Sequence, residues 1–143
     1  MNDKHMFKAA REASFESDYT GGRMKIGCVI AYKGTILARS FNSDKTHPSQ
    51  DKYNVYRFSK DDKGYLPPKG HAEVLALSKI RYLNIDFSKV HVYIYRELAN
   101  GKLGMCRPCK ACLAALHEMR VKHIHYTTYD GYCHEVLNYG KMA

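Results

Sequence analysis

The stretch between residues 71 and 119 constrains the fold of this chain more than any other part of its sequence. Apolar residues at helical spacing predict a helix over 71–83. A run rich in β-branched and aromatic residues predicts a buried strand over 89–95, and Pro108 opens a second helix over 109–119. A strand flanked by two such helices belongs to a sheet that helices cover, so the chain is expected to be an α/β protein.

The flanking segments add a helix and two hairpins. A first helix is expected over residues 3–17, and a short helix over 50–58 fits within the long segment 42–69. Only the turn signal Asp130-Gly131 separates the last two apolar runs, so no crossover fits and the chain is expected to end in an antiparallel hairpin. We therefore expect a single domain spanning residues 1–143, folded as a three-layer α/β/α sandwich around a mixed sheet of about five strands. The further strands expected are 26–31, 35–41, 121–128 and 132–137.

Composition supports an ordinary globular domain. The chain has 143 residues, of which 45% are apolar and 26% charged, and its 10 Gly and 4 Pro exclude a fibrous repeat. Apolar runs such as 28–32 and 92–95 are far shorter than the roughly 20 residues that cross a bilayer, so no membrane segment is expected. The first residues lack the apolar stretch of a secretory signal, which favours a cytoplasmic protein.

Two short motifs carry chemistry. His71-Ala72-Glu73 stands at the start of one predicted helix, and Pro108-Cys109-Lys110-Ala111-Cys112 stands at the start of the next. Residues three apart on a helical turn face the same way, so two cysteine sulfurs and one histidine nitrogen can meet at a zinc ion. Three protein ligands leave the fourth tetrahedral position open, as in catalytic zinc sites. Glu73, two residues from His71, is placed to take a proton from a water molecule at the metal.

Other cysteines and histidines leave alternatives open. Cys106 would be the fourth ligand of a structural zinc site, but we favour a small buried residue beside the site. Cys28 and Cys133 fall in predicted strands and are expected in the core. His123 and His125 share one strand face with the spacing of metal ligands, although a hydrogen-bonded or solvent-facing pair is the simpler interpretation.

At these motifs the chain resembles the zinc-dependent cytidine and deoxycytidylate deaminase superfamily, whose signature is H-x-E followed by P-C-x-x-C. The order of elements from about residue 3 to the end is similar to that family as well. The resemblance implies a hydrolase with Zn²⁺ held by His71, Cys109 and Cys112, and with Glu73 as the proton shuttle. It also implies a homo-oligomer.

The substrate-binding residues are less sharply marked. The resemblance implies that backbone groups of Ala72 and Cys109 hold the base and the activated water, and that Asn42 contacts the sugar or base. Lys45 and His47 are candidates to hold a phosphate or sugar, the alternative being a solvated loop. The predicted final hairpin resembles that of free-nucleoside cytidine deaminases, whereas the long segment after Asn42 does not resemble their short insert.

The net charge of +9, from 23 Lys and Arg against 14 Asp and Glu, favours an anionic partner. Most cations are spread along the chain, as on a solvated surface. Residues 23–69 are an exception, because they combine a basic excess with aromatic side chains, a composition typical of single-stranded nucleic-acid binding.

We therefore expect hydrolytic deamination of a cytosine nucleoside or nucleotide, a small-molecule substrate, to uracil with release of ammonia. One alternative is deamination of cytosine or adenine in single-stranded DNA or RNA, which salt dependence of binding would distinguish. A second alternative is a non-catalytic zinc-binding interaction module. The base, the sugar, the phosphate state and the oligomeric state are left open by the sequence.

Overall fold

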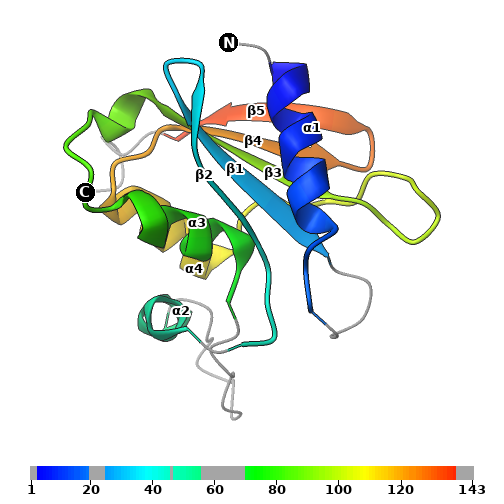
Figure 1. The fold of residues 1–143 in the computed structure, drawn as a ribbon, viewed down its shortest axis with the longest axis horizontal. Coiled ribbons are helices and arrows are strands. Elements are labelled where there is room, and N and C mark those ends of the chain that lie inside the picture. Colours follow the sequence, from blue (N-terminus) through cyan, green and yellow to red (C-terminus); the bar gives the residue numbers. More distant parts are fainter. Residues whose placement is uncertain (1–2, 20–24, 46, 56–69, 138–143) are drawn as a thin grey trace.

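The computed structural model describes residues 3–19, 25–45, 47–55 and 70–137. Five strands form one mixed sheet in the order β2-β1-β3-β4-β5 (Figure 1). Strand β1 is antiparallel to β2 and β3, β3 is parallel to β4, and β4 is antiparallel to β5. The predicted fold class and its final antiparallel hairpin are confirmed. The elements are α1 (Asp3–Ser14), β1 (Ile26–Tyr32), β2 (Thr35–Phe41), α2 (Pro48–Asn54), α3 (Ala72–Ile80), η1 (Phe87–Lys89), β3 (Val90–Arg96), α4 (Lys110–Glu118), β4 (His123–Thr128) and β5 (Gly131–Val136).

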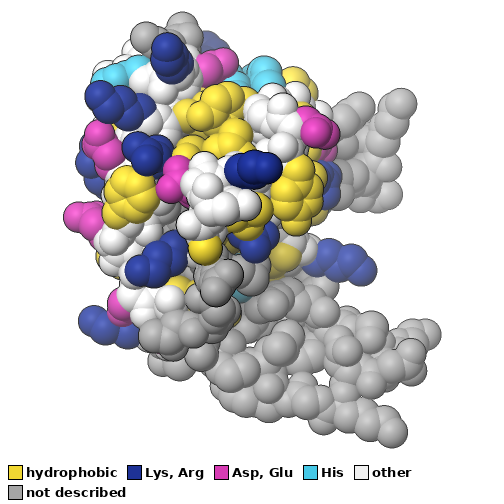
Figure 2. All heavy atoms as spheres, turned by 90° about the vertical axis from the view of Figure 1, so that its right-hand side faces the viewer, with side chains coloured by type: hydrophobic (Ala, Val, Ile, Leu, Met, Phe, Trp, Pro, Cys, Tyr) yellow, Lys and Arg dark blue, Asp and Glu magenta, His cyan; other side chains and the backbone are white. Residues whose placement is uncertain are grey.

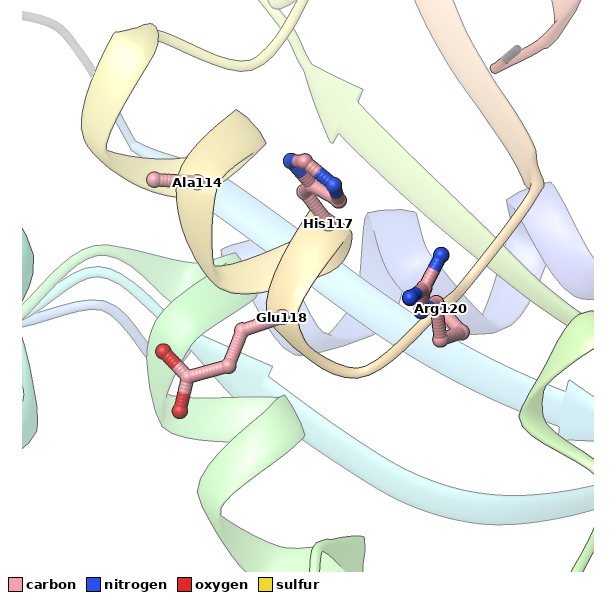
Figure 3. A pocket seen from close by; sticks show the side chains of 4 residues that line it. All are labelled: Ala114, His117, Glu118 and Arg120. Atoms are coloured by element: carbon pink, nitrogen blue, oxygen red, sulfur yellow. The ribbon is translucent and has the colours of Figure 1, made fainter. Parts of the chain in front are cut away.

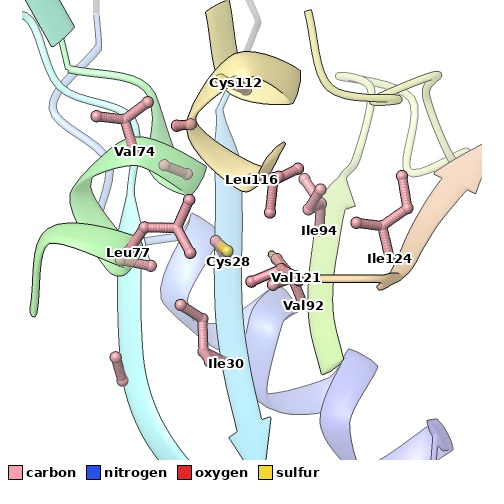
Figure 4. Packing of buried hydrophobic residues seen from close by; sticks show 14 of the residues in the cluster. Cys28, Ile30, Val74, Leu77, Val92, Ile94, Cys112, Leu116, Val121 and Ile124 are labelled. Atoms are coloured by element: carbon pink, nitrogen blue, oxygen red, sulfur yellow. The ribbon is translucent and has the colours of Figure 1, made fainter. Parts of the chain in front are cut away.

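The central strands β1 and β3 are buried on both faces, which explains their continuous apolar sequences. Alternate side chains belong to two separate cores, because successive residues of a strand point to opposite faces. The core on the side of α3 and α4 contains Cys28, Ile30, Val92 and Ile94 (Figure 4). The core on the side of α1 contains Val29, Ala31, Tyr93 and Tyr95.

Helix α1 covers one face of the sheet, over β1, β2 and β3. Its buried stripe includes Met6, Phe7 and Ala10. Where the helix crosses β1, the strand carries Gly27, and a Cβ there would lie 2.0 Å from the carbonyl oxygen of Ala10. Glycine is therefore required for this close approach of helix and strand.

Helices α3 and α4 cover the opposite face, and α2 packs against both of them (Figure 1). This arrangement completes the three predicted layers. None of the helices in the described ranges is long and apolar enough to cross a membrane.

Several element ends differ from the predicted ones. Helix α1 ends at Ser14 rather than at residue 17, because the next three amides donate to carbonyls three residues back and tighten the chain. Helix α2 begins at Pro48, two residues before the expected start. The last hairpin turns at Tyr129 and Asp130, one residue early, and Gly131 with φ 137° opens β5. The residues 46 and 56–69 of the long predicted loop lie outside the described ranges.

The strand directions bring the carboxyl ends of β2, β3 and β4 to one end of the sheet. Backbone hydrogen bonds attach the following segments there: Ser43 N–H donates to Gly70 O at 2.8 Å, and Cys106 N–H donates to Thr127 O at 3.1 Å. Helices α3 and α4 therefore both begin at this end of the sheet, where sites in such sheets form.

Candidate active site

Three side chains with metal-ligating atoms meet where α3 and α4 begin. The sulfurs of Cys109 and Cys112 lie 3.7 Å apart, and His71 Nδ1 lies 3.5 Å and 3.4 Å from them respectively. Tetrahedral zinc, with Zn–S of about 2.3 Å and Zn–N of about 2.0–2.1 Å, places two sulfurs about 3.8 Å apart and sulfur and nitrogen about 3.6 Å apart. The three atoms therefore already form one face of a zinc tetrahedron. We call this set the Cys–His cluster.

Both helices begin at members of this cluster. His71 is the N-cap of α3 and Cys109 the N-cap of α4, each with extended backbone. Their carbonyls accept the first helical hydrogen bonds, from the amides of Leu75 and Leu113. The positive ends of the two helices favour negative charge at this point, such as that of a thiolate.

The electrostatics of the two sulfurs also favours a thiolate. The hydrogen bond with Cys112 lowers the pKa of Cys109 to about 3, and the hydrogen bond and charge of His71 act in the same direction. The hydrogen bond with Cys109, together with burial, raises the pKa of Cys112 well above its ordinary value. The hydrogen-bonded pair therefore holds a thiol proton that a metal ion must displace.

Glu73 lies in the first turn of α3 and is only 5% exposed. Burial raises the pKa of its carboxyl above the ordinary value, while the charge of His71 opposes this rise. The carboxyl also interacts with Cys109 and Cys112, so it faces the Cys–His cluster. A buried carboxyl of raised pKa beside a metal-ligand set is suited to take up and return a proton.

Gln50 fixes the backbone of His71, and the sequence analysis missed it. Its Oε1 accepts a hydrogen bond from His71 N–H at 3.0 Å, and its Nε2 donates to Asn54 Oδ1 at 2.8 Å. The side chain is 0% exposed, on a helix that contacts both α3 and α4. Because glutamine is usually exposed, the residue type did not indicate a buried role for Gln50. The sequence indicated only that Gln50 lies in the short predicted helix.

Two of the predicted substrate-binding residues lie at this end of the sheet. Ala72 is the first residue of α3 and is fully buried. Asn42 directly follows β2, and its Oδ1 accepts hydrogen bonds from Ile26 N–H at 2.9 Å and from Ser17 Oγ at 2.7 Å. The oxygen of Asn42 therefore supports the start of β1, and any contact with a ligand would use its amide nitrogen.

The backbone after Asn42 runs beside Gly70, the residue that precedes His71. Lys45 is exposed, and its carbonyl oxygen accepts a hydrogen bond from Gly70 N–H at 3.1 Å. His47 caps α2, and its Nδ1 accepts from Ser49 N–H at 3.2 Å. Contact of either side chain with phosphate or sugar stays a prediction.

The other cysteines take the places expected of core residues, with one exception. Cys106 is 6% exposed, donates to Ile94 O at 3.3 Å, and lies 3.1 Å from Thr127 Oγ1. Burial raises its pKa to about 12, so it stays a neutral thiol beside the site. Cys28 is fully buried, whereas Cys133 is only half-buried because β5 is an edge strand.

A surface hollow of about 280 Å³ lies at the carboxyl end of α4, the end remote from the Cys–His cluster (Figure 3). It contains no member of that cluster. Its lining residues are Ala114, His117, Glu118 and Arg120.

Solved structures share this fold at low sequence identity. A cytidine deaminase from Burkholderia pseudomallei is 14% identical, with 95% of this chain and 93% of that chain covered and a TM-score of 0.63. A dCMP deaminase from the cyanophage S-TIM5 is 20% identical, with 87% and 81% covered and a TM-score of 0.58. A guanine deaminase from Bacillus subtilis is 24% identical, with 90% and 65% covered and a TM-score of 0.55. No curated protein sequence matches this chain significantly.

The fold and the site together define the class of zinc-dependent hydrolytic deaminases. Residues 1–128 match the family model of the cytidine and deoxycytidylate deaminase zinc-binding region. The chain belongs to this family. The expected family, enzyme class and zinc cofactor are thereby confirmed, and a non-catalytic interaction module is no longer needed to explain the motifs.

Proposed function

We propose that this chain hydrolyses the exocyclic amine of cytosine in a nucleoside or nucleotide, giving uracil and ammonia. The observation that carries this proposal is the meeting of His71, Cys109 and Cys112 with the buried carboxyl of Glu73 at two helix starts. The first three residues would hold zinc, and Glu73 would move the protons. The tetrahedral spacing of the three ligand atoms supports this assignment.

Zinc, when bound, lowers the pKa of a water molecule to about 7 and so supplies a nucleophile at neutral pH. Glu73 would take one proton from the attacking water as the water oxygen bonds to C4 of the base, and would pass this proton to N3. Glu73 would then move the second proton of the water to the exocyclic nitrogen. The C4–N bond would break, ammonia would leave, and C4 would keep the oxygen as a carbonyl. Backbone groups of Ala72 and Cys109 would orient the base for this attack.

The proposed cytosine substrate rests on two observations. The sheet ends in the antiparallel β4–β5 hairpin, and the chain resembles a cytidine deaminase and a dCMP deaminase in fold. Exposed lysines lie near the ligands: Lys110 directly follows Cys109, and Lys45 is hydrogen-bonded through its carbonyl to Gly70. These cations favour a nucleotide over an uncharged nucleoside, with Asn42, Lys45 and His47 as the proposed sugar and phosphate contacts.

Ammonia release from a panel of substrates tests the proposal. The panel contains cytidine, deoxycytidine, deoxycytidylate, adenosine, guanine and a single-stranded oligonucleotide, with Glu73→Gln as the inactive control. Release from a cytosine nucleoside or nucleotide, lost in the control, supports it. Release from guanine, adenosine or the oligonucleotide alone contradicts it, and steep loss of binding with rising salt would indicate a polynucleotide substrate.

We further propose that residues 1–143 act as one catalytic domain that forms a homo-oligomer in the cytoplasm. All five strands belong to one sheet, and the five cysteines are free, which agrees with a reducing compartment. Light scattering on the purified chain tests the oligomeric state.

A further inference from the structure

Four histidines gather on the face of the sheet that carries α1, opposite to the Cys–His cluster. They come from three neighbouring strands: His91 from β3, His123 and His125 from β4, and His134 from β5. The strand register brings them together, because His91 pairs with His123 and His125 pairs with His134. Histidine side chains are visible at the top of the molecule in Figure 2. We call this set the histidine cluster.

Three of these rings converge closely enough to share one ion. Ring nitrogens of His91, His125 and His134 all lie within 4.8 Å of one another. His91 Nδ1 lies 2.8 Å from His125 Nε2, and the rings of His125 and His134 stack with centroids 4.1 Å apart. Ligand nitrogens on a tetrahedral zinc ion lie about 3.3 Å apart, so small side-chain rotations would convert these contacts into a ligand set.

The burial of the three rings suits an ion that enters from one side. His125 is 3% exposed, His91 is half-buried, and His134 is exposed. The cluster is therefore closed toward the core and open to solvent at β5.

Three further side chains lie beside the candidate ligands. Asp3, at the start of α1, has Oδ2 4.0 Å from His125 Nδ1, while the other ring nitrogen of His125 faces His91. Tyr93 donates to Asp3 Oδ1 and holds the carboxylate in place. His123 Nδ1 lies 3.1 Å from His134 Nε2. A metal-ligating histidine usually donates its second ring N–H to a carboxylate, and closing the 4.0 Å gap between His125 and Asp3 would make this hydrogen bond.

We propose that His91, His125 and His134 bind a divalent transition metal ion, Zn²⁺ or a similar imidazole-binding cation, at a second site. Three imidazoles suit Zn²⁺, Ni²⁺ or Cu²⁺ rather than Mg²⁺ or Ca²⁺, which take oxygen ligands. The sheet separates this site from the Cys–His cluster, so the ion serves no step of deamination. Its effect is to join β3, β4 and the edge strand β5, stabilising the fold by binding only to the folded chain.

Zinc content under defined conditions tests the second site. The full chain, freed of metal with a chelator, is dialysed against buffered free Zn²⁺, and zinc per chain is measured by atomic emission. We expect two ions per wild-type chain and one per His134→Gln chain, whose exposed substitution leaves the core unchanged. His117→Gln, which removes a half-buried histidine of α4 outside the cluster, is the matched control and should keep two.

A wild-type chain with one zinc ion, or a His134→Gln chain that still holds two, overturns the proposal. Cobalt spectra then identify the ligands. The ion in the histidine cluster should add ligand-field absorption without thiolate-to-cobalt charge transfer, and this absorption should be missing in His134→Gln. Thiolate charge transfer from every bound cobalt ion, or an identical spectrum in the variant, contradicts the assignment.

Discussion

The Cys–His cluster and the histidine cluster lie on opposite faces of one sheet and are built from different elements. The ligands of the first stand at the starts of helices α3 and α4, near the carboxyl ends of the strands. The candidate ligands of the second stand within three adjacent strands, and His91 is near the amino end of β3. Helix starts supply amide groups and a positive dipole, whereas strand faces supply only side chains.

This difference matches the roles proposed for the two clusters, one reactive and one structural. In the proposed reaction the base receives protons at the metal, and a buried carboxyl, that of Glu73, lies beside the Cys–His cluster. In the histidine cluster, Asp3 lies near Nδ1 of His125, whereas His91 lies near Nε2 of the same ring. The imidazole ring therefore separates this carboxylate from the proposed ion. The atom spacing differs as well: the Cys–His atoms already fit a zinc tetrahedron, whereas His91 and His125 must exchange a 2.8 Å hydrogen bond for the ion.

The largest expected effect is that of Cys109→Ala. Losing a thiolate ligand should empty the Cys–His cluster and reduce ammonia release to background, while the histidine cluster keeps its ion. Zinc content and ammonia release on the same sample measure both. Cys133→Ala, at a half-buried cysteine of the edge strand, is the control. Two zinc ions in Cys109→Ala would contradict the ligand assignment.

Glu73→Gln should separate metal binding from catalysis. An amide of the same shape cannot shuttle protons, so kcat should fall by about 10²–10⁴-fold, the usual contribution of general acid–base catalysis. Zinc content should equal that of the wild type. Glu12→Gln, an exposed carboxyl of α1, should leave kcat unchanged. Equal kcat in both variants would remove Glu73 from the mechanism.

Gln50→Ala should weaken the Cys–His cluster without touching a ligand. The variant leaves His71 N–H without its buried acceptor, so zinc affinity should fall by about 10-fold and the free energy of unfolding by about 1–3 kcal/mol. Chelator competition and denaturant titration measure the two changes. Asp51→Asn, exposed on the same helix, is the control. Unchanged affinity in Gln50→Ala would limit Gln50 to a packing role.

The smallest effect concerns the ion pair between Arg107 and Glu135, which joins the two regions. Arg107 precedes Cys109 by two residues, and Glu135 adjoins His134; the paired atoms lie 2.9 Å apart on half-exposed side chains. Removing one partner should therefore cost at most about 1 kcal/mol of the free energy of unfolding.

The contribution of this pair should depend on pH. The hydrogen bond from Arg107 lowers the folded-state pKa of Glu135. The stabilisation is therefore present above the ordinary carboxyl pKa and is lost as pH falls through the lowered value. The free energies of unfolding of wild type and Arg107→Ala, from denaturant titrations, should differ at neutral pH, and this difference should shrink as the pH falls below the ordinary carboxyl pKa. A difference that persists in acid would show that packing, not charge, is responsible.

The helices, the strands and the Cys–His cluster could be predicted because their signals are local. Cys109 and Cys112 are three residues apart, Pro108 marks a helix start, and the apolar run of β3 reflects burial on both faces. The antiparallel ending followed from the short connection before Gly131. Helix ends were less accurate, because hydrogen bonds such as that from Ser14 Oγ to Arg11 O decide them.

The missed features depend on contacts between distant residues. His91 and His134 have no motif around them, and only the pairing of β3, β4 and β5 brings them to His125. Gln50 likewise gains its role from the packing of α2 against α3. A sequence gives residue types and spacing, but the register between strands and the docking of a helix decide which side chains meet.

Helix α1 packs closely against β1 at Gly27, and its two ends contact different parts of the molecule. Asp3 at its start lies beside His125 and Tyr93, and Ser17, three residues after its end, donates to Asn42. Lifting this one helix from the sheet would remove the contact of Asp3 with the histidine cluster and the contact of Ser17 with Asn42 in a single cooperative opening. Hydrogen-exchange protection of the α1 amides should therefore report the free energy of this opening, and any side chain at residue 27 should lower it.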